Sequence, residues 1–275
     1  MKILNLLIST HNDRLLGLKN IVKEYCNEIV FTVSHQVNEK LTSESLKYIE
    51  ILKKNKNVIY SQINSKGVAK NRNNTLKYRV KNSICLLCDD DVIYFENAFN
   101  SILKLFNENK SMDVLTFKIK TFSGKDYKKY KGIGFKHNLK TLSNIGIIDV
   151  AFREELIDKY NLSFDERFGP GGYYSIGEDF IFMTDAIKKG LNIQFEPIDV
   201  VQHEDIGTGQ ILRDDIIFGR GAMFSRVFGS LSFVLNIYFA TKNYKKYSSV
   251  FSYWKYNMLL FEGSLNFLRK NKNEK

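Results

Sequence analysis

Short apolar runs alternate with segments of helical periodicity along the first part of the chain. The apolar positions 15, 16, 18, 21 and 22 recur at helical spacing, whereas 28–33 is β-branched and aromatic. Strands are therefore predicted at 2–9, 28–33 and 57–62, and helices at 15–27 and 43–54. Strands that alternate with helices in this way are typical of an α/β protein with a mainly parallel central sheet.

The alternation continues to residue 203, and a different pattern follows it. Helices are predicted at 98–107 and 178–189, strands at 113–121 and 145–152, a short strand within 190–197, and a β-branched pair at 200–201 before His203. The stretch 122–138 is rich in Lys, Gly and Tyr and has loop character. From 214 to 239 the pattern is helical, with arginines among phenylalanines, and 244–267 continues in the same style.

One apolar run, within Ser83–Tyr94, delivers three consecutive carboxylates to its end. Five apolar or thiol residues in succession predict a strand that is covered on both faces, so its carboxyl end is a ligand site. Alternation along the strand would place Asp89 and Asp91 on one side and Asp90 on the other. Converging carboxylates favour a divalent cation between them. The alternative is a polar strand end followed by a turn.

Composition agrees with an ordered, reduced globular protein. The 275 residues include only two prolines and are 44% hydrophobic. The odd number of cysteines favours a cytosolic setting, and we interpret Cys85 and Cys88 as core residues because no second pair lies nearby. Segment 1–10 is predicted to be a strand rather than a signal peptide, because Asn5 interrupts its apolar run. With no uninterrupted apolar stretch of about 18 residues, a membrane-spanning helix is not expected.

The positive charge is concentrated at the end of the chain. The net charge is +11, and residues 219–275 carry ten Lys and Arg against two acidic residues. We therefore predict two domains, at 1–218 and 219–275. The basic, aromatic second part could dock on anionic lipid, or its aromatic residues could close the core or form a dimer interface.

Two further segments bear on the chemistry. Gly67 opens a basic helical segment, Lys70 to Asn74, directly before the aspartate strand, and cations at a helix start attract anions such as phosphate, although a solvated basic face would look the same. Glu178 and Asp179 stand at the head of another helix. There they could complement the helix dipole or take part in catalysis.

The order and spacing of these motifs resemble those of family 2 glycosyltransferases, which have the GT-A fold. The resemblance covers about residues 1–210. It is carried by the polar turn after the first strand, the segment Gly67–Asn74, the triplet Asp89-Asp90-Asp91, the pair Glu178-Asp179 that heads a helix, and the later His203. It implies a GT-A fold with a mixed, mainly parallel central sheet, followed here by a helical C-terminal extension.

The resemblance also implies a role for each motif on the donor side. Asp91 would be the main ligand of a Mn²⁺ or Mg²⁺ ion, and Asp89 would support the metal or contact the ribose. His203 resembles the histidine that completes this site in some members, although a core or surface histidine is the alternative. Asp90 would face the core. The other donor contacts would come from Arg72 and Lys66 near the diphosphate and from Thr10, His11 and Asn12 near the nucleobase.

On the acceptor side, the resemblance makes Asp179 the general base, with Glu178 orienting the acceptor or the backbone. One position departs from the family. Members often carry an aspartate at the end of the second strand that reads the base, whereas this chain has Ser34-His35-Gln36 there. The choice of a uridine donor therefore rests on the other motifs.

The expected function is inverting transfer of a sugar, UDP-linked by preference, to a glycan or lipid-linked saccharide in bacterial capsule, lipopolysaccharide or exopolysaccharide assembly. The enzyme would work in the cytoplasm, peripherally on the inner face of the membrane. A metal-dependent sugar nucleotidyltransferase is the alternative enzyme, but segment 8–12 lacks the glycines typical of that class. A non-enzymatic module that binds membrane or nucleic acid through the basic tail is the third interpretation, and the carboxylates of the main domain argue against nucleic acid.

Overall fold

The computed structural model describes the chain except for residues 1–2, 24–27, 144, 205–211 and 274–275. The described chain forms two compact units. The first comprises residues 1–66, 70–164 and 182–205, and the second comprises 67–69, 165–181 and 206–275. The predicted boundary at 218 stays a prediction. The structural division falls earlier in the chain and gives the second unit the loop that leads to Glu178.

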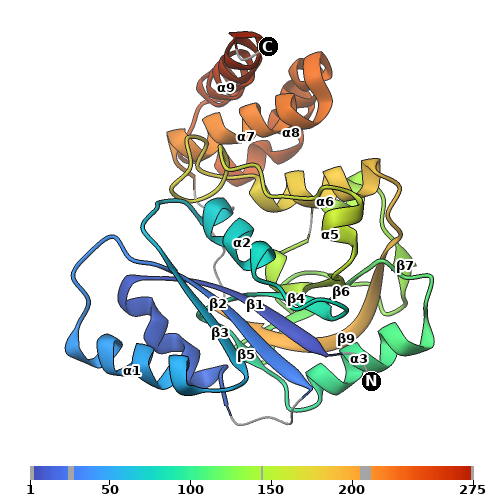
Figure 1. The fold of residues 1–275 in the computed structure, drawn as a ribbon. Coiled ribbons are helices and arrows are strands. Elements are labelled where there is room, and N and C mark those ends of the chain that lie inside the picture. Colours follow the sequence, from blue (N-terminus) through green and yellow to red (C-terminus); the bar gives the residue numbers. More distant parts are fainter. Residues whose placement is uncertain (1–2, 24–27, 144, 205–211, 274–275) are drawn as a thin grey trace. The chain divides into compact units, whose positions relative to one another are not determined.

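The first unit is built on one mixed sheet (Figure 1). Its strand order is β3-β2-β1-β4-β8-β6-β9-β5, with β7 paired to β9. Strands β1 to β4 run parallel to one another, β6 runs parallel to β9, and β8 is antiparallel to both of its neighbours. The strands are β1 (Leu4–His11), β2 (Ile29–Gln36), β3 (Val58–Ile63), β4 (Ile84–Asp89), β5 (Ile93–Tyr94), β6 (Val114–Thr121), β7 (Phe135–Lys136), β8 (Val150–Arg153) and β9 (Ile193–His203).

The parallel strands are buried as their sequences require. Every residue of β1 except His11 is buried, and so is every residue of β4 except Asp89. Apolar runs without alternation fit a sheet that is covered on both faces. The mixed, mainly parallel sheet predicted from the sequence is confirmed.

Helices α1, α3 and α6 begin and end within one residue of the predicted bounds. Helix α1 (Ser43–Lys54) has the predicted bounds, and the Thr42 side chain caps it by accepting from the Ser45 amide. Helix α3 (Ala98–Glu108) buries one apolar face, which includes Phe99 and Ile102. The remaining helices before the C-terminal region are α2 (Val68–Lys77), α4 (Leu139–Leu142), α5 (Leu156–Lys159) and α6 (Glu178–Lys188).

The helix predicted at 15–27 is wrong in type and extent. The described residues form a 3₁₀ helix, η1 (Asn12–Asn20), and 24–27 lie outside the described residues. Close packing is the reason, because a Cβ on Gly17 would lie 2.2 Å from the Asp90 carbonyl oxygen. The tight turn thus brings η1 against the aspartate triplet.

Three predicted strand segments and one predicted loop also differ from the structure. Only the end of 145–152 is a strand, because the 3₁₀ turn η2 (Ile147–Asp149) precedes β8. The two segments predicted between 190 and 203 form the single long strand β9, which includes Pro197 and pairs with β6 through a register shift. The loop predicted at 122–138 contains the short edge strand β7.

The second unit packs three C-terminal helices: α7 (Asp214–Phe228), α8 (Ser232–Tyr247) and α9 (Tyr253–Asn273). The helix predicted at 214–239 is interrupted by the 3₁₀ turn η4 (Gly229–Leu231), because Gly229 has φ +59°. Helices α7 and α9 cross at close range. A Cβ on Gly221 would lie 1.9 Å from the Leu260 oxygen, and one on Gly263 would lie 1.9 Å from the Phe218 oxygen.

The core of this unit joins the helices to the loop 165–181. Phe168 and Tyr174 of the loop pack against Met223 of α7 and Phe267 of α9. The Tyr174 hydroxyl also donates a hydrogen bond of 2.9 Å to Asn266 Oδ1. Part of the aromatic C-terminal region therefore closes a core, as one of the two sequence interpretations has it.

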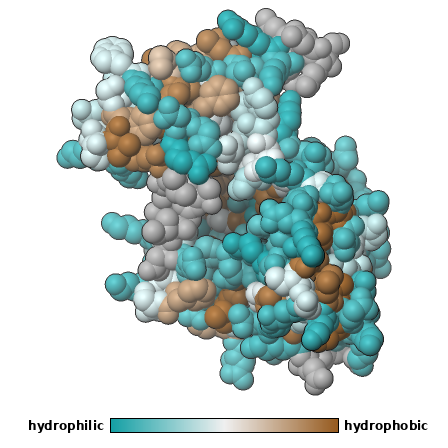
Figure 2. All heavy atoms as spheres, turned by 90° about the vertical axis from the view of Figure 1, so that its left-hand side faces the viewer, coloured by the Kyte–Doolittle hydropathy of each residue, from teal (hydrophilic) through white to brown (hydrophobic). Residues whose placement is uncertain are grey.

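Helices α7 and α8 also bear on membrane association. Among the described residues, the run Asp214–Tyr247 is long and apolar enough to cross a membrane by length and composition alone, with one third of its most apolar window buried. A core helix of a soluble protein satisfies the same criterion. Figure 2 shows that apolar side chains of the C-terminal helices also reach the surface, among polar ones.

Candidate functional site

The aspartate triplet lies beside the carboxyl end of β1. Strands β1 and β4 are parallel neighbours, with Ser9 in register with Asp89. Strand β4 ends at Asp89, so Asp90 and Asp91 belong to the turn that leads to β5. Only the first of the three carboxylates is therefore in the strand, although Asp90 is buried and its two neighbours are partly exposed, as the predicted alternation has it. Each carboxylate has its own set of partners.

Asp90 is buried and acts as an anchor. Its carboxylate accepts hydrogen bonds of 2.7 Å from Thr10 Oγ1 and 2.9 Å from Arg14 Nε. Burial raises the pKa of Asp90, while the bonds from Arg14 and Thr10 act in the opposite direction. The prediction that Asp90 points inward agrees with this placement. The structure adds that Asp90 fixes both Thr10 and Arg14.

Asp91 lies between the side chains of Arg14 and His203. Arg14 Nη2 donates to Asp91 Oδ2 over 2.7 Å, and His203 Nε2 lies 3.5 Å from Asp91 Oδ1. The close approach of His203, followed by the hydrogen bond from Arg14, lowers the pKa of Asp91 to about 2. Asp91 in turn raises the pKa of His203. Within the described chain, Asp91 Oδ1 is buried and has no hydrogen-bond partner.

This pair fits a metal ion by the chemistry of its donor atoms. His203 Nδ1 lies 2.9 Å from the Glu204 carbonyl oxygen, an acceptor, so Nδ1 carries a proton. In neutral His203 the Nε2 lone pair then faces Asp91 Oδ1, and two acceptors this close need a cation or a proton between them. The described residues form no ready cluster of three or more His, Cys, Asp or Glu side chains. Asp91 and His203 are thus direct neighbours, whereas Asp89 forms an ion pair with Arg72.

Asp89 pairs with Arg72 of helix α2. Arg72 is buried, and its Nη2 atom lies 3.2 Å from Asp89 Oδ1. Its guanidinium also lies over the ring of Phe164, with 5.6 Å between the guanidinium carbon and the ring centre. The two residues predicted for the donor side, Arg72 and Asp89, are therefore direct neighbours. The exposed Lys66 precedes them at the end of the loop before Gly67.

Three asparagines hold α2 in place. Asn71 Nδ2 donates to the Thr10 carbonyl oxygen over 2.8 Å, which ties α2 to β1. Asn73 exchanges two hydrogen bonds with the backbone of Phe164. Asn74 Nδ2 donates to the hydroxyls of Ser34 and Ser61, at the ends of β2 and β3. The sequence signal for these contacts was the presence of three asparagines in one helix. Asparagine is a weak helix former, so it is expected inside a helix mainly where its side chain makes hydrogen bonds.

The residues predicted near the nucleobase have different environments. Thr10 is buried against Asp90, whereas His11 is exposed at the end of β1. The Asn12 carbonyl oxygen lies 2.9 Å from Nε2 of the fully buried His35, whose Nδ1 lies 2.7 Å from the Tyr60 hydroxyl. Burial lowers the pKa of His35. A neutral His35 therefore stands at the position where family 2 members often carry an aspartate.

Sequence reasoning missed Arg14, the residue that connects two of the three carboxylates. It lies in the first turn of η1 and contacts both Asp90 and Asp91. Its side chain is 49% exposed, so the contact is open to solvent on one side. The available signal was its position, since Arg14 follows the end of β1 and the carboxyl ends of parallel neighbours meet at the same edge.

The predicted acceptor-side residues lie in the second unit. Glu178 and Asp179 begin α6, Glu178 is buried, and Asp179 is half-buried. Gly169 has φ +91°, and a Cβ there would lie 2.7 Å from the Glu178 carboxyl carbon. The Val68 amide donates to the Pro170 oxygen over 2.9 Å. The loop around Gly169 is thus packed closely on Glu178 and on the start of α2.

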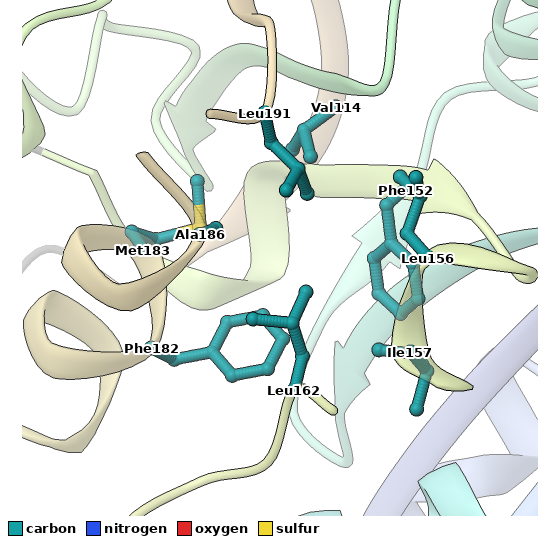
Figure 3. A pocket seen from close by; sticks show the side chains of 9 residues that line it. All are labelled: Val114, Phe152, Leu156, Ile157, Leu162, Phe182, Met183, Ala186 and Leu191. Carbon is teal, nitrogen blue, oxygen red and sulfur yellow. The ribbon is translucent and has the colours of Figure 1, made fainter. Parts of the chain in front are cut away.

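A cavity in the first unit is not part of this site. Figure 3 shows its lining, which is apolar throughout and comes from β6, β8, α5, α6 and the segments next to α5 and α6. A small cavity without polar groups offers no partner to a charged ligand. Its lining residues are Val114, Phe152, Leu156, Ile157, Leu162, Phe182, Met183, Ala186 and Leu191.

Comparison with solved structures gives the fold. The structure of S. aureus TarS 1-349 in complex with UDP-GlcNAc matches 92% of this chain and 76% of its own, with 16% identity and a TM-score of 0.63. Two others, TarS 1-349 alone and in complex with UDP, match all of this chain and 92% of theirs, with 14% identity and TM-scores of 0.65 and 0.64. The fold is GT-A.

The GT-A fold confirms the predicted fold class, including the C-terminal helices that follow the sheet. No family model matches the chain, and no curated protein matches it in sequence. The assignment to family 2 therefore stays a prediction, as do the individual roles of the site residues. In this GT-A domain the aspartate triplet and His203 stand together in the first unit, and Glu178 and Asp179 stand in the second.

Proposed function

We propose that the protein is an inverting glycosyltransferase that moves a sugar from a nucleotide diphosphate sugar, preferably UDP-linked, to a hydroxyl group. The observation that carries the proposal is the pairing of Asp91 with His203 after β4 in a GT-A fold. S. aureus TarS, which is similar in fold, was crystallised with UDP-GlcNAc and with UDP. This similarity supports a nucleotide sugar as the donor.

On the donor side, Asp91 and His203 would hold a Mn²⁺ or Mg²⁺ ion, with Asp89 beside them. A metal ion there supplies a positive charge that stabilises the departing diphosphate. Arg72 and Lys66 add positive charge for phosphate oxygens, and Asp89 keeps the Arg72 guanidinium in place. Thr10, His11 and Asn12 line the end of β1, where we place the nucleoside.

On the acceptor side, Asp179 would take the proton of the acceptor hydroxyl as its oxygen attacks the anomeric carbon. One carbon–oxygen bond forms to the acceptor, the bond between the anomeric carbon and the diphosphate oxygen breaks, and the nucleoside diphosphate leaves with the bonding electrons. Attack from the face opposite the leaving group inverts the anomeric centre. Glu178, buried under the loop around Gly169, would keep the start of α6 in position for Asp179.

The proposed setting is the assembly of a bacterial capsule, lipopolysaccharide or exopolysaccharide in the cytoplasm, on a glycan or lipid-linked saccharide. The motifs that resemble family 2 support this setting. Cytoplasmic chemistry also agrees with the free, buried thiols of Cys85 and Cys88, whose pKa values are raised by burial.

A donor screen tests the proposed function. Thermal unfolding is measured with UDP-, GDP- and dTDP-sugars in the presence of Mn²⁺, and again with excess chelator. We expect one nucleotide class to raise the melting temperature by several degrees and the chelator to remove the shift. Release of free sugar from the same donor would confirm the bond that is broken. Pyrophosphate release from a nucleotide triphosphate and a sugar phosphate would instead identify a nucleotidyltransferase, and no shift with any donor would contradict both enzymes.

A further inference from the structure

Helices α8 and α9 share an exposed apolar surface that the fold does not use. We call it the outer face. Its side chains are between 40% and 80% exposed, whereas the inner sides of the same helices bury Ala240, Tyr247 and Leu260 in the core. The exposed members of the outer face are Leu231, Val234, Ile237, Tyr238, Trp254, Met258 and Leu265.

Each helix contributes a stripe rather than scattered residues. On α9, Trp254, Met258 and Leu265 recur at spacings of four and seven residues, which puts them on one side of the helix. On α8, Ile237 and Tyr238 follow Val234 by three and four residues, which also puts them on one side of the helix. The stripes are amphipathic and solvent-exposed, and packing against α7 does not account for them.

Two contacts bring the stripes side by side. The rings of Phe233 and Phe261 lie 5.5 Å apart between centroids, and Thr241 Oγ1 lies 3.0 Å from the Tyr253 hydroxyl. The two contacts show that the helices run antiparallel, because the earlier residue of α8 meets the later residue of α9. Ile237, midway between Phe233 and Thr241, therefore lies opposite the part of α9 that carries Met258. The outer face therefore combines apolar side chains of both helices, with the exposed Glu262 at the edge of the α9 stripe.

The charges around the outer face are mainly positive. Residues 232–273 contain seven Lys and Arg and a single acidic residue, Glu262. Lys242, Lys245 and Lys246 follow the apolar stripe of α8 and are exposed. Lys242 Nζ lies 5.5 Å from the centre of the Tyr238 ring, so a basic group borders the stripe directly. The surface is thus apolar in the middle and cationic at its edge.

We propose that the outer face docks on an anionic membrane, with α8 and α9 lying in the plane of the interface. A bilayer surface with negative headgroups matches an apolar stripe bordered by lysines, because the stripe enters the acyl boundary while the cations stay at headgroup level. Trp254 and Tyr238 have side chains with an apolar body and a polar group, which membrane interfaces favour. The proposal goes beyond sugar transfer and does not depend on it.

The test is flotation of the full-length protein with vesicles. Vesicles of phosphatidylcholine alone are compared with vesicles that contain about 30% phosphatidylglycerol, at low and at high salt. We expect binding to the anionic vesicles that high salt weakens. The double variant Ile237→Ser/Trp254→Ser should bind at least about 10-fold more weakly. The triple variant Lys242→Gln/Lys245→Gln/Lys246→Gln should bind about 100-fold more weakly at low salt and show a weaker salt dependence.

Matched control variants separate binding through the outer face from nonspecific binding through other exposed apolar or basic residues. Leu46→Ser/Ile51→Ser removes two apolar side chains of α1 with 54% and 61% exposure, and Lys54→Gln/Lys56→Gln/Lys110→Gln removes three exposed lysines of the first unit. Both controls should bind like the wild type, and all variants should keep the wild-type circular dichroism spectrum and a cooperative thermal unfolding.

Two results would overturn the proposal. One is a wild type that does not float with anionic vesicles, or that floats no better than the Ile237/Trp254 variant. The other is a wild-type protein that is oligomeric by light scattering while this variant is monomeric. The outer face would then be covered by a second copy of the chain.

Discussion

The Nε2 atom of His203 lies 3.5 Å from Asp91 Oδ1, a buried oxygen without a hydrogen-bond partner in the described part of the chain. The two residues are far apart in sequence. Strand β9 brings His203 to the triplet because β9 pairs with β5, the short strand that follows Asp91. A carboxylate oxygen that faces an imidazole nitrogen in this way suits a divalent cation.

Metal binding should depend on both residues. We expect Asp91→Asn and His203→Gln each to weaken Mn²⁺ binding by at least about 10-fold, because the first removes the negative charge of the carboxylate and the second removes the imidazole nitrogen. Electron paramagnetic resonance of free Mn²⁺ measures this without a substrate. Asp158→Asn, which alters an exposed carboxylate paired with Lys81, is the control and should bind Mn²⁺ like the wild type. Unchanged affinity in both site variants would remove the metal from this position.

Replacement of the proposed base should separate catalysis from donor binding. Asp179→Asn keeps the size of the side chain but cannot accept the acceptor proton, so kcat should fall by about 10²- to 10⁴-fold. The donor-dependent thermal shift should remain, because the donor ligands are other residues. Asp185→Asn on the same helix is the control and should leave kcat unchanged. If Asp179→Asn turned over at a near-normal rate, the base would have to be another group.

Stability should fall in mild acid through His137. This buried histidine has its ring nitrogens 2.9 Å and 3.0 Å from the hydroxyls of Thr116 and Thr141. Burial, and then the charge of Lys128, lowers its pKa from 6.5 to about 4. Because the unfolded chain binds this proton first, the stability present above pH 6.5 is lost as the pH falls toward 4.

Urea unfolding at two pH values measures this loss. Between about pH 7.5 and pH 5, His137 should account for about 2 kcal/mol of the decrease in the free energy of unfolding. The variant His137→Gln cannot take up the proton and should lose correspondingly less over the same interval, although it is less stable at neutral pH. Equal losses in wild type and variant would show that other groups carry the acid sensitivity.

Glycine should be required at position 221, where α7 crosses α9. Gly221→Ala would place a Cβ 1.9 Å from the Leu260 oxygen, and the backbone of a packed helix cannot move away cheaply. We expect a loss of at least about 3 kcal/mol in the free energy of unfolding, and faster proteolysis within the C-terminal helices. Gly132→Ala is the control, because a Cβ at that position would meet nothing within 4 Å, so this variant should unfold like the wild type.

Much of the sheet was predictable from local sequence. The uninterrupted apolar runs of β1 and β4 predicted buried parallel strands, and the bounds of α1 were predicted to the residue. The place of the aspartate triplet at a strand end followed from the same runs. These features depend on neighbours in sequence, because the periodicity of a segment reflects which of its faces are buried.

The composition of the candidate site was predictable only in part. Asp91, His203, Asp89 and Arg72 were all named from motifs, and the resemblance already placed His203 in the site of Asp91, yet the pairing of Asp89 with Arg72 emerged from the structure. Arg14 was not predicted, because nothing in its local sequence distinguishes it from any polar turn residue. Its partners are more than seventy positions away in the chain.

The sequence by itself determined the parallel core, the position of the carboxylates and the basic, aromatic character of the end of the chain. The tertiary structure decided that β8 enters the sheet antiparallel to its neighbours, that Arg14 joins Asp90 to Asp91, and that Gly221 and Gly263 let α7 and α9 cross. It also decided which aromatic residues are buried and which form the outer face. The reason is physical: periodicity records that a face is apolar, whereas the partner of that face is set by contacts between residues distant in sequence.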